Sequence, residues 1–187
     1  YCTTIRNMAA TGFDLLGYNF LPSFVWRTDM AAAGRGGAKV TSFDLADIGA
    51  GNALAGYRLT PTEPITEPIT AEQMWANHAY FLDAVLPVAE EAGVRLALHP
   101  DDPPVDVPLG GAARIFTSPE ALVAARTQAG NSPSWGLNFC IGTISERGGA
   151  AAVEQAGDTL GAAGAIFYAH FRDVQGTGPS VHERFLR

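Results

Sequence analysis

The sequence predicts an α/β fold that corresponds to about half of a (β/α)8 (TIM) barrel, with about four parallel strands and their helices. Helix-type and strand-type patterns alternate along the chain, which is typical of a parallel sheet with right-handed crossovers. The strand candidates are short and mostly apolar, as expected of strands buried on both faces. Four strands alone would leave two open edges, whereas a closed barrel has none but needs about 250 residues. We therefore expect residues 1–187 to form a single incomplete barrel domain, truncated at both ends.

The first third of the chain is expected to contain one helix, one strand and a long connection. Residues 1–11 have a helical pattern that stops at Gly12, and the apolar run 13–21 predicts a buried strand before Pro22. Residues 23–69 are rich in Gly, Pro and Thr and only weakly periodic. Such length without a clear period predicts a loop or insertion, which we expect over the barrel mouth.

The remainder predicts three helix-strand units. Thr70 and Gln73 form a capping box that opens a helix ending at Gly93. Ser118 is an N-cap candidate, followed by proline in the first turn, for a helix that Gly130 closes. A Gly- and Ala-rich third helix is expected over residues 149–160. The strands expected after these helices are residues 94–99, 135–140 and 165–170.

Composition and charge restrict the classes of function. Hydrophobic residues make up 47% of the 187, and the net charge is −7. An acidic chain is a poor partner for nucleic acid or an anionic membrane, which both need a basic face. No apolar run reaches the length of a membrane span, no leader opens the chain, and two cysteines make no disulfide framework. We expect a cytoplasmic protein, and because the first residue is Tyr1 we expect a piece of a longer gene product.

His99, Cys140 and His170 each occupy the last position of an expected strand. In a barrel these ends converge on one mouth. Two imidazoles and a thiolate suit a divalent transition ion; alone they favour Zn²⁺, while an added carboxylate and an oxygen-rich substrate extend the choice to Mn²⁺, Fe²⁺ or Co²⁺. The alternative for each residue is a hydrogen-bonded histidine or a small buried cysteine. Spacing alone leaves both interpretations open.

Five polar residues near these strand ends are candidates for substrate binding or for supporting the metal ligands: Asn19, Asp101, Asp102, Arg114 and Arg172. The aspartates could accept hydrogen bonds from sugar hydroxyls or from the imidazoles. Their alternative is to satisfy backbone N–H groups in a proline-flanked turn, which we expect of one of the two. Either arginine could clamp a carboxylate through two parallel hydrogen bonds. The alternative for both is a surface ion pair.

Taken together, these segments resemble the mannonate dehydratase family over nearly the whole chain. The motifs that carry the resemblance are HPDDPP at 99–104, LGGAARI at 109–115, GLNFCIG at 136–142 and HFRDV at 170–174, with YNFLP at 18–22 and residues 81–92. The resemblance implies a xylose-isomerase-like TIM barrel of which this chain covers strands four to seven. It also implies a divalent ion, usually Mn²⁺, held by His, Cys, His and a later Asp, of which the first three fall on His99, Cys140 and His170.

The resemblance further implies conversion of D-mannonate to 2-dehydro-3-deoxy-D-gluconate and water in hexuronate catabolism. Val25 stands where the family commonly has Asp. The family's fourth ligand and its acid-base residues lie beyond Arg187, so the catalytic residues are unknown here and we expect the 187-residue piece alone to be inactive. The sequence is compatible with a homo-oligomeric full-length protein. The alternatives are a metal-dependent sugar isomerase or epimerase on the same barrel and a non-catalytic sugar-acid binding protein.

Overall fold

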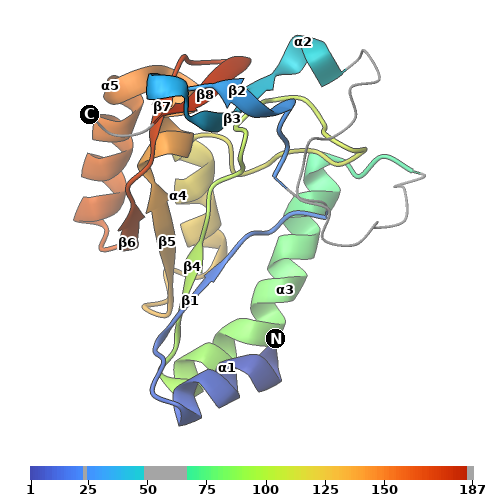
Figure 1. Cartoon of the computed structure of the whole chain (residues 1–187). Coiled ribbons are helices and arrows are strands. Elements are labelled where there is room, and N and C mark those ends of the chain that lie inside the picture. The colour runs from blue at the N-terminus through green and yellow to red at the C-terminus, as the bar shows by residue number, and fades with distance from the viewer. Residues whose placement is uncertain (23–24, 49–66, 185–187) are drawn as a thin grey trace.

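The main sheet contains four parallel strands, as the sequence predicts. The computed structural model describes residues 1–22, 25–48 and 67–184. The strands pair in the order β1-β4-β5-β6, and each neighbouring pair is parallel (Figure 1). Their bounds are Leu15–Tyr18, Arg95–Leu98, Trp135–Cys140 and Ile166–His170. β5 is buried along its full length, whereas β6 is half exposed at the sheet edge.

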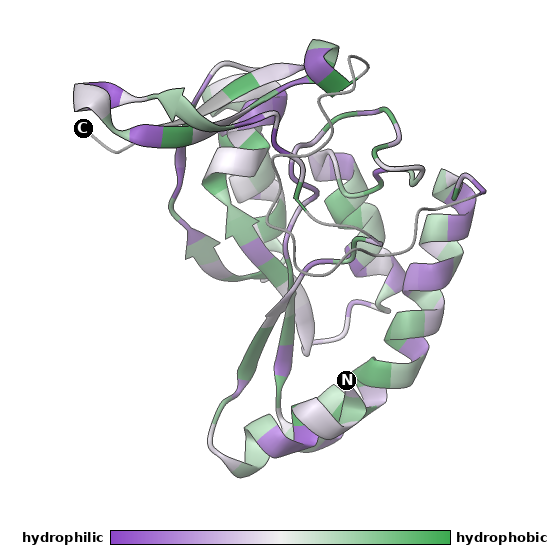
Figure 2. Cartoon of the chain, turned by 45° about the vertical axis from the view of Figure 1, so that its right-hand side comes forward, coloured by the Kyte–Doolittle hydropathy of each residue, from purple (hydrophilic) through white to green (hydrophobic). Residues whose placement is uncertain are grey.

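The helices begin and end largely where their caps predict. Their bounds are α1 Cys2–Ala10, α3 Ala71–Ala92, α4 Pro119–Gln128 and α5 Ile141–Ala162. The Thr70 side chain accepts from the Gln73 N–H at the start of α3, and Gly93 ends that helix in the left-handed region at φ 68°. Ser118 caps α4 in the same way. Hydrophobic and hydrophilic segments follow one another along the α3 ribbon (Figure 2). The buried residues Leu82, Val85 and Ala89 recur every three or four positions, so one face of α3 packs in the main core.

Helix α5 begins eight residues before the start expected from its composition. Its first turn follows Cys140 directly, and the helix is interrupted at Gly148 and Gly149, where the backbone leaves helical geometry. The sequence signal at Gly149 therefore marks a break within the helix. The true start depends on the Cys140 sulfur, which accepts the Thr143 N–H as an N-cap.

The prediction of a loop over residues 23–69 is wrong for its described part. β2 (Asp29–Ala33), the 3₁₀ turn η1 (Arg35–Gly37), β3 (Lys39–Asp44) and α2 (Leu45–Ile48) lie there. β3 pairs antiparallel with β2 and with β8 (Ser180–Arg184), and β8 pairs with β7 (Asp173–Gln175). β2 is close to β3 in the sequence but pairs with it in an irregular register, and β8 is remote in the sequence, so no local period indicated this sheet. The part of the expected loop at 49–66 lies outside the described residues.

This second sheet lies near the end of the main sheet where the parallel strands terminate (Figure 1). Trp26 and Phe43 pack with Val181 from β8 and with two residues of the loop after β4, Val105 and Leu109. The loop after β4 is thereby held against the second sheet. Among the described residues, no helix combines the length and hydropathy needed to cross a membrane.

The inner face of the main sheet is strongly curved, although the sheet does not close in the described chain. β1 and β6 are its two edges. Even so, a Cβ built on Gly17 of β1 would lie 2.7 Å from the Tyr168 hydroxyl of β6. The Tyr168 side chain therefore reaches across the inner face to the opposite edge. A Cβ on Gly136 would lie 2.6 Å from the Ala165 carbonyl oxygen, so that position requires glycine to keep β5 and β6 close.

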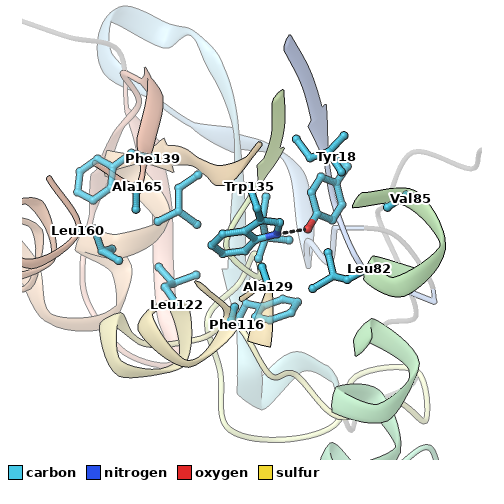
Figure 3. Close-up of a cluster of buried hydrophobic side chains, with 14 of the residues drawn as sticks. Tyr18, Leu82, Val85, Phe116, Leu122, Ala129, Trp135, Phe139, Leu160 and Ala165 are labelled. Carbon is cyan, nitrogen blue, oxygen red and sulfur yellow. Dashed lines mark hydrogen bonds between the residues drawn. The ribbon is translucent and has the colours of Figure 1, made fainter. Parts of the chain in front are cut away.

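The main core contains a chain of hydrogen bonds around Trp135, of which Figure 3 shows the bond to Tyr18. Trp135 Nε1 donates to the Tyr18 hydroxyl at 2.8 Å, and that hydroxyl lies 3.2 Å from His78 Nε2. Gln128 Nε2 donates to the Trp75 carbonyl, so Gln128 Oε1 is the atom that faces His78 Nδ1, and it can only accept. In the neutral ring Nε2 is then the acceptor, and the Tyr18 proton points at it. His78 Nδ1 then carries the ring proton and donates to Gln128 Oε1 at 2.6 Å. Burial lowers the pKa of His78, which favours this neutral form.

Replacing Tyr18 by phenylalanine is expected to lower the free energy of unfolding by about 1–3 kcal/mol. The substitution keeps the ring but leaves the Trp135 indole N–H and His78 Nε2 buried without this partner. Urea denaturation of the full-length protein measures the effect. Tyr80→Phe is the matched control, because Tyr80 is 80% exposed. Equal stabilities of the two variants would contradict a stabilising role for the two buried hydrogen bonds of the Tyr18 hydroxyl.

Candidate metal centre

The three residues expected at strand ends meet at one place. Cys140 and His170 are cross-strand partners at the ends of β5 and β6. His99 follows β4, and its N–H donates to the Tyr18 carbonyl at 2.8 Å, which extends the β1-β4 pairing by one residue. One potential ligand atom from each side chain lies within 4.8 Å of the other two. The parallel strands thus bring together residues that are far apart in the sequence.

The His99 ring is oriented by its own loop. Its Nδ1 lies 2.7 Å from the Pro100 carbonyl oxygen, which can only accept, so Nδ1 carries a proton and donates. This leaves Nε2 as the nitrogen that faces Cys140, and metal-binding histidines are commonly fixed through their other ring nitrogen in this way. Burial lowers the pKa of His99, but the hydrogen bond and charge of Cys140 outweigh it and raise the pKa.

The Cys140 sulfur is buried, and its surroundings favour the ionised thiolate form. Burial raises the pKa of the thiol, but the hydrogen bond and charge of His99 and the hydrogen bonds from Thr143 lower it to about 6. The Thr143 N–H lies 3.5 Å from Sγ, and the Thr143 hydroxyl lies 3.2 Å from it. A sulfur at a helix N-terminus beside an imidazole is a typical setting for a stabilised thiolate.

The chemistry of this donor set fits a divalent transition ion. Two imidazole nitrogens and one thiolate are the ligand types that such ions prefer, whereas Ca²⁺ and Mg²⁺ prefer oxygen. His99 is half-buried, Cys140 is buried and His170 is exposed. The centre is therefore a possible metal site that is open on the His170 side.

Asp102, from the loop after β4, lies at the centre of a buried group of charges. Arg27 donates to both of its carboxylate oxygens at 2.7 and 2.8 Å, and Arg172 NH1 donates to Oδ2 at 2.6 Å. Arg172 also forms an ion pair with Glu146 of α5. Burial raises the pKa of Asp102, but the two arginines outweigh it and hold that pKa well below its ordinary range. Burial and the negative charge of Asp102 raise the pKa of Glu146.

The other predicted polar residues have different surroundings. Asp101 Oδ2 accepts the backbone N–H groups of Ile115 and Phe116 at 2.7 and 2.9 Å, as expected of one of the two aspartates. Arg114 is buried, and its NH2 donates to the Asp102 carbonyl at 2.8 Å. Asn19 is exposed just beyond β1 and lines a cavity of about 260 Å³. None of the three metal-type residues lines that cavity.

Two residues at this site were missed by sequence analysis: Arg27 and Thr143. Arg27 lies in the segment expected to be a loop, and nothing local marks it as a partner of Asp102. Thr143 stands three residues after Cys140, which is the spacing from an N-cap to N3. That spacing could have identified it if cysteine had been considered as a cap.

Comparisons with known proteins agree with the resemblance seen in the motifs. The family model described as D-mannonate dehydratase (UxuA) matches residues 1–184. A mannonate dehydratase of Shouchella clausii is 38% identical over 165 residues, covering 77% of this chain and 45% of that protein. One from Thermotoga maritima is 32% identical over 203 residues, covering 95% of this chain and 54% of that protein.

The fold of this chain is also similar to that of a solved mannonate dehydratase. The crystal structure of mannonate dehydratase from Streptococcus suis serotype 2 is similar with a TM-score of 0.79 and 30% sequence identity, covering 98% of this chain and 50% of that chain. The chain thus spans about half the length of the curated relatives and the solved structure that it matches. With a family match along nearly its full length, this chain belongs to the mannonate dehydratase family.

Proposed function

We propose that the protein containing this chain is a metal-dependent hydro-lyase that converts D-mannonate to 2-dehydro-3-deoxy-D-gluconate and water. Membership of the mannonate dehydratase family supports the reaction. The observation that carries the proposal to this chain is the meeting of His99, Cys140 and His170 within 4.8 Å at one end of the sheet. An isomerase or epimerase activity is not favoured, because the matched family and relatives are dehydratases.

We further propose that the described sheet is part of a TIM barrel, with the rest of the barrel outside this chain. The curvature that brings Tyr168 of β6 against Gly17 of β1 supports this, as does the open edge at β6. In such a barrel the carboxyl ends of the strands form the active-site face. The three candidate ligands lie at that end of β4, β5 and β6.

His99, Cys140 and His170 would hold the cation, which we propose to be Mn²⁺ with Fe²⁺, Co²⁺ and Zn²⁺ as alternatives. When bound, the ion supplies positive charge that stabilises the negative charge developing on the substrate as the C2 proton leaves. His99 Nδ1 keeps its proton and donates it in a hydrogen bond to the Pro100 carbonyl, so that Nε2 presents its lone pair. Thr143 donates to Cys140 Sγ and helps to keep the sulfur anionic.

The remaining predicted residues are proposed in two roles. Asn19, exposed just beyond β1, is proposed to contact the sugar acid. Asp101, Asp102, Arg114 and Arg172 are proposed to support the site, because their charged groups contact other protein groups. Asp101 and Asp102 together fix the loop that follows His99. No acid-base residue is assigned within this chain.

Incubating the full-length protein with D-mannonate and a divalent ion is expected to yield a 2-keto-3-deoxy acid. Removing the ion with a chelator is expected to abolish turnover, and adding Mn²⁺ back should restore it, because the proposed reaction depends on the positive charge of the ion. A colorimetric assay for the keto-deoxy acid measures both results. Turnover of aldoses without that product would favour an isomerase. Tight binding of D-mannonate without turnover would indicate a binding protein.

A further inference from the structure

We propose that Thr143 is a positioning residue for the Cys140 sulfur, and that Arg172 fixes the direction of the Thr143 hydroxyl. The inference rests on the proposed metal site and adds to it a residue that holds one ligand. Thr143 lies in the first turn of α5, three residues after Cys140, and is fully buried. Its role is to keep the sulfur aimed at the two imidazoles.

The direction of the Thr143 hydroxyl follows from the chemistry of its two partners. Thr143 Oγ1 lies 3.2 Å from Cys140 Sγ and 3.2 Å from Arg172 NH1. A guanidinium can only donate, so Oγ1 accepts from Arg172, and its single proton points at the sulfur. The Thr143 backbone N–H also faces Sγ, at 3.5 Å. One residue therefore directs two hydrogen bonds to the candidate ligand atom.

Arg172 is itself held in place from several sides. Its NH1 donates to Asp102 Oδ2 at 2.6 Å, and its NH2 pairs with the Glu146 carboxylate. Gly142 permits this position, because a Cβ there would lie 2.9 Å from the Arg172 Cγ. The Arg172 side chain therefore packs directly against the first turn of α5. The buried charges around Asp102 are connected in this way to the Cys140 sulfur through one hydroxyl.

Hydrogen bonds to a ligand sulfur act on both the geometry and the electronic properties of a metal site. They restrict the rotation of the side chain, and they withdraw charge from the sulfur and so tune the bound ion. Loss of such a supporting partner typically costs about 10–100-fold in metal affinity. We expect a loss of that size when the Thr143 hydroxyl is removed.

The test uses Co²⁺ titration of the full-length protein, because a thiolate bound to Co²⁺ gives a charge-transfer absorption band. Thr143→Val removes the hydroxyl at nearly constant volume. It is expected to weaken Co²⁺ binding by about 10–100-fold and to move the band to longer wavelength, since the sulfur then donates charge more easily. Thr143→Ser keeps a hydroxyl and is expected to restore the band and the Kd of the unmodified protein.

Ser145→Ala is the matched control from the same turn. Ser145 Oγ donates to the Gly142 carbonyl at 2.8 Å and has no described bond to the sulfur, so its removal should move neither Kd nor band. An unchanged band and Kd in Thr143→Val, or a Ser variant that behaves like Val, would overturn the inference. If Thr143→Val does not fold, Thr143→Ala provides the same comparison without β-branching. Absence of any thiolate band in the unmodified protein would instead refute the proposed metal site.

Discussion

Replacing Cys140 by serine is expected to abolish metal binding and dehydration while leaving the fold intact. Cys140 is the only one of the three proposed ligands that is fully buried. Its sulfur lies close to the imidazoles of His99 and His170 and caps the first turn of α5. Serine is a good N-cap, so helix α5 keeps its start. A neutral hydroxyl is a much weaker ligand than a thiolate, and we expect a loss of affinity beyond the roughly 10–100-fold seen when only a supporting partner is removed.

Metal content by mass spectrometry and the keto-deoxy acid assay measure this result in the full-length protein. Cys2→Ser is the matched control. Cys2 lies in α1, and its Sγ donates to the Ala84 carbonyl at 3.4 Å, away from the candidate metal centre. The control is expected to keep its metal and its activity. A Cys140 variant that retains both would show that the sulfur is a buried structural group.

Replacing Asp102 by asparagine is expected to destabilise the protein by about 3–5 kcal/mol, the cost of removing one partner from a buried ion pair. The side-chain shape is retained, but the two arginines that pair with the carboxylate lose its charge. The lost ion pairs connect three segments of the chain. Arg27 lies just before the second sheet, Asp102 lies in the loop after β4, and Arg172 follows β6. Urea unfolding of the metal-free full-length protein measures the effect.

The control for this variant is another acidic residue of the same loop. Asp106 pairs with Arg147 at 2.6 Å, but its side chain is 63% exposed, so Asp106→Asn should cost no more than about 1 kcal/mol. The depressed pKa of Asp102 means that its contribution is complete above the ordinary value of 3.8 and is lost as the pH falls through the folded pKa. The difference between Asp102→Asn and the unmodified protein should therefore be complete near pH 5 and become smaller as the pH rises toward 8, because without the Asp102 charge the pKa of Glu146 is raised less. Equal costs at Asp102 and Asp106 would contradict the buried ion pairs.

The sequence by itself determined the elements that depend on local chemistry. The Thr70 and Ser118 caps and the stop at Gly93 identified two helices, because each cap satisfies backbone groups within four residues of it. Short apolar runs that stop at His99, Cys140 and His170 identified three strands and their ends. In parallel strands such ends lie at one edge, so the sequence also predicted that these three side chains come together.

Only the tertiary structure decided the second sheet and the environment of the ligands. β3 pairs on one side with the nearby β2 and on the other with residues near 180, and the sequence of 39–44 gives no indication of that remote partner. Arg27, Asp102 and Arg172 meet through contacts that span most of the chain. The direction of the Thr143 hydroxyl depends on a guanidinium 29 residues away. Local propensities act within a few residues, whereas charge pairing and antiparallel pairing depend on distance in space, which the order of residues does not reveal.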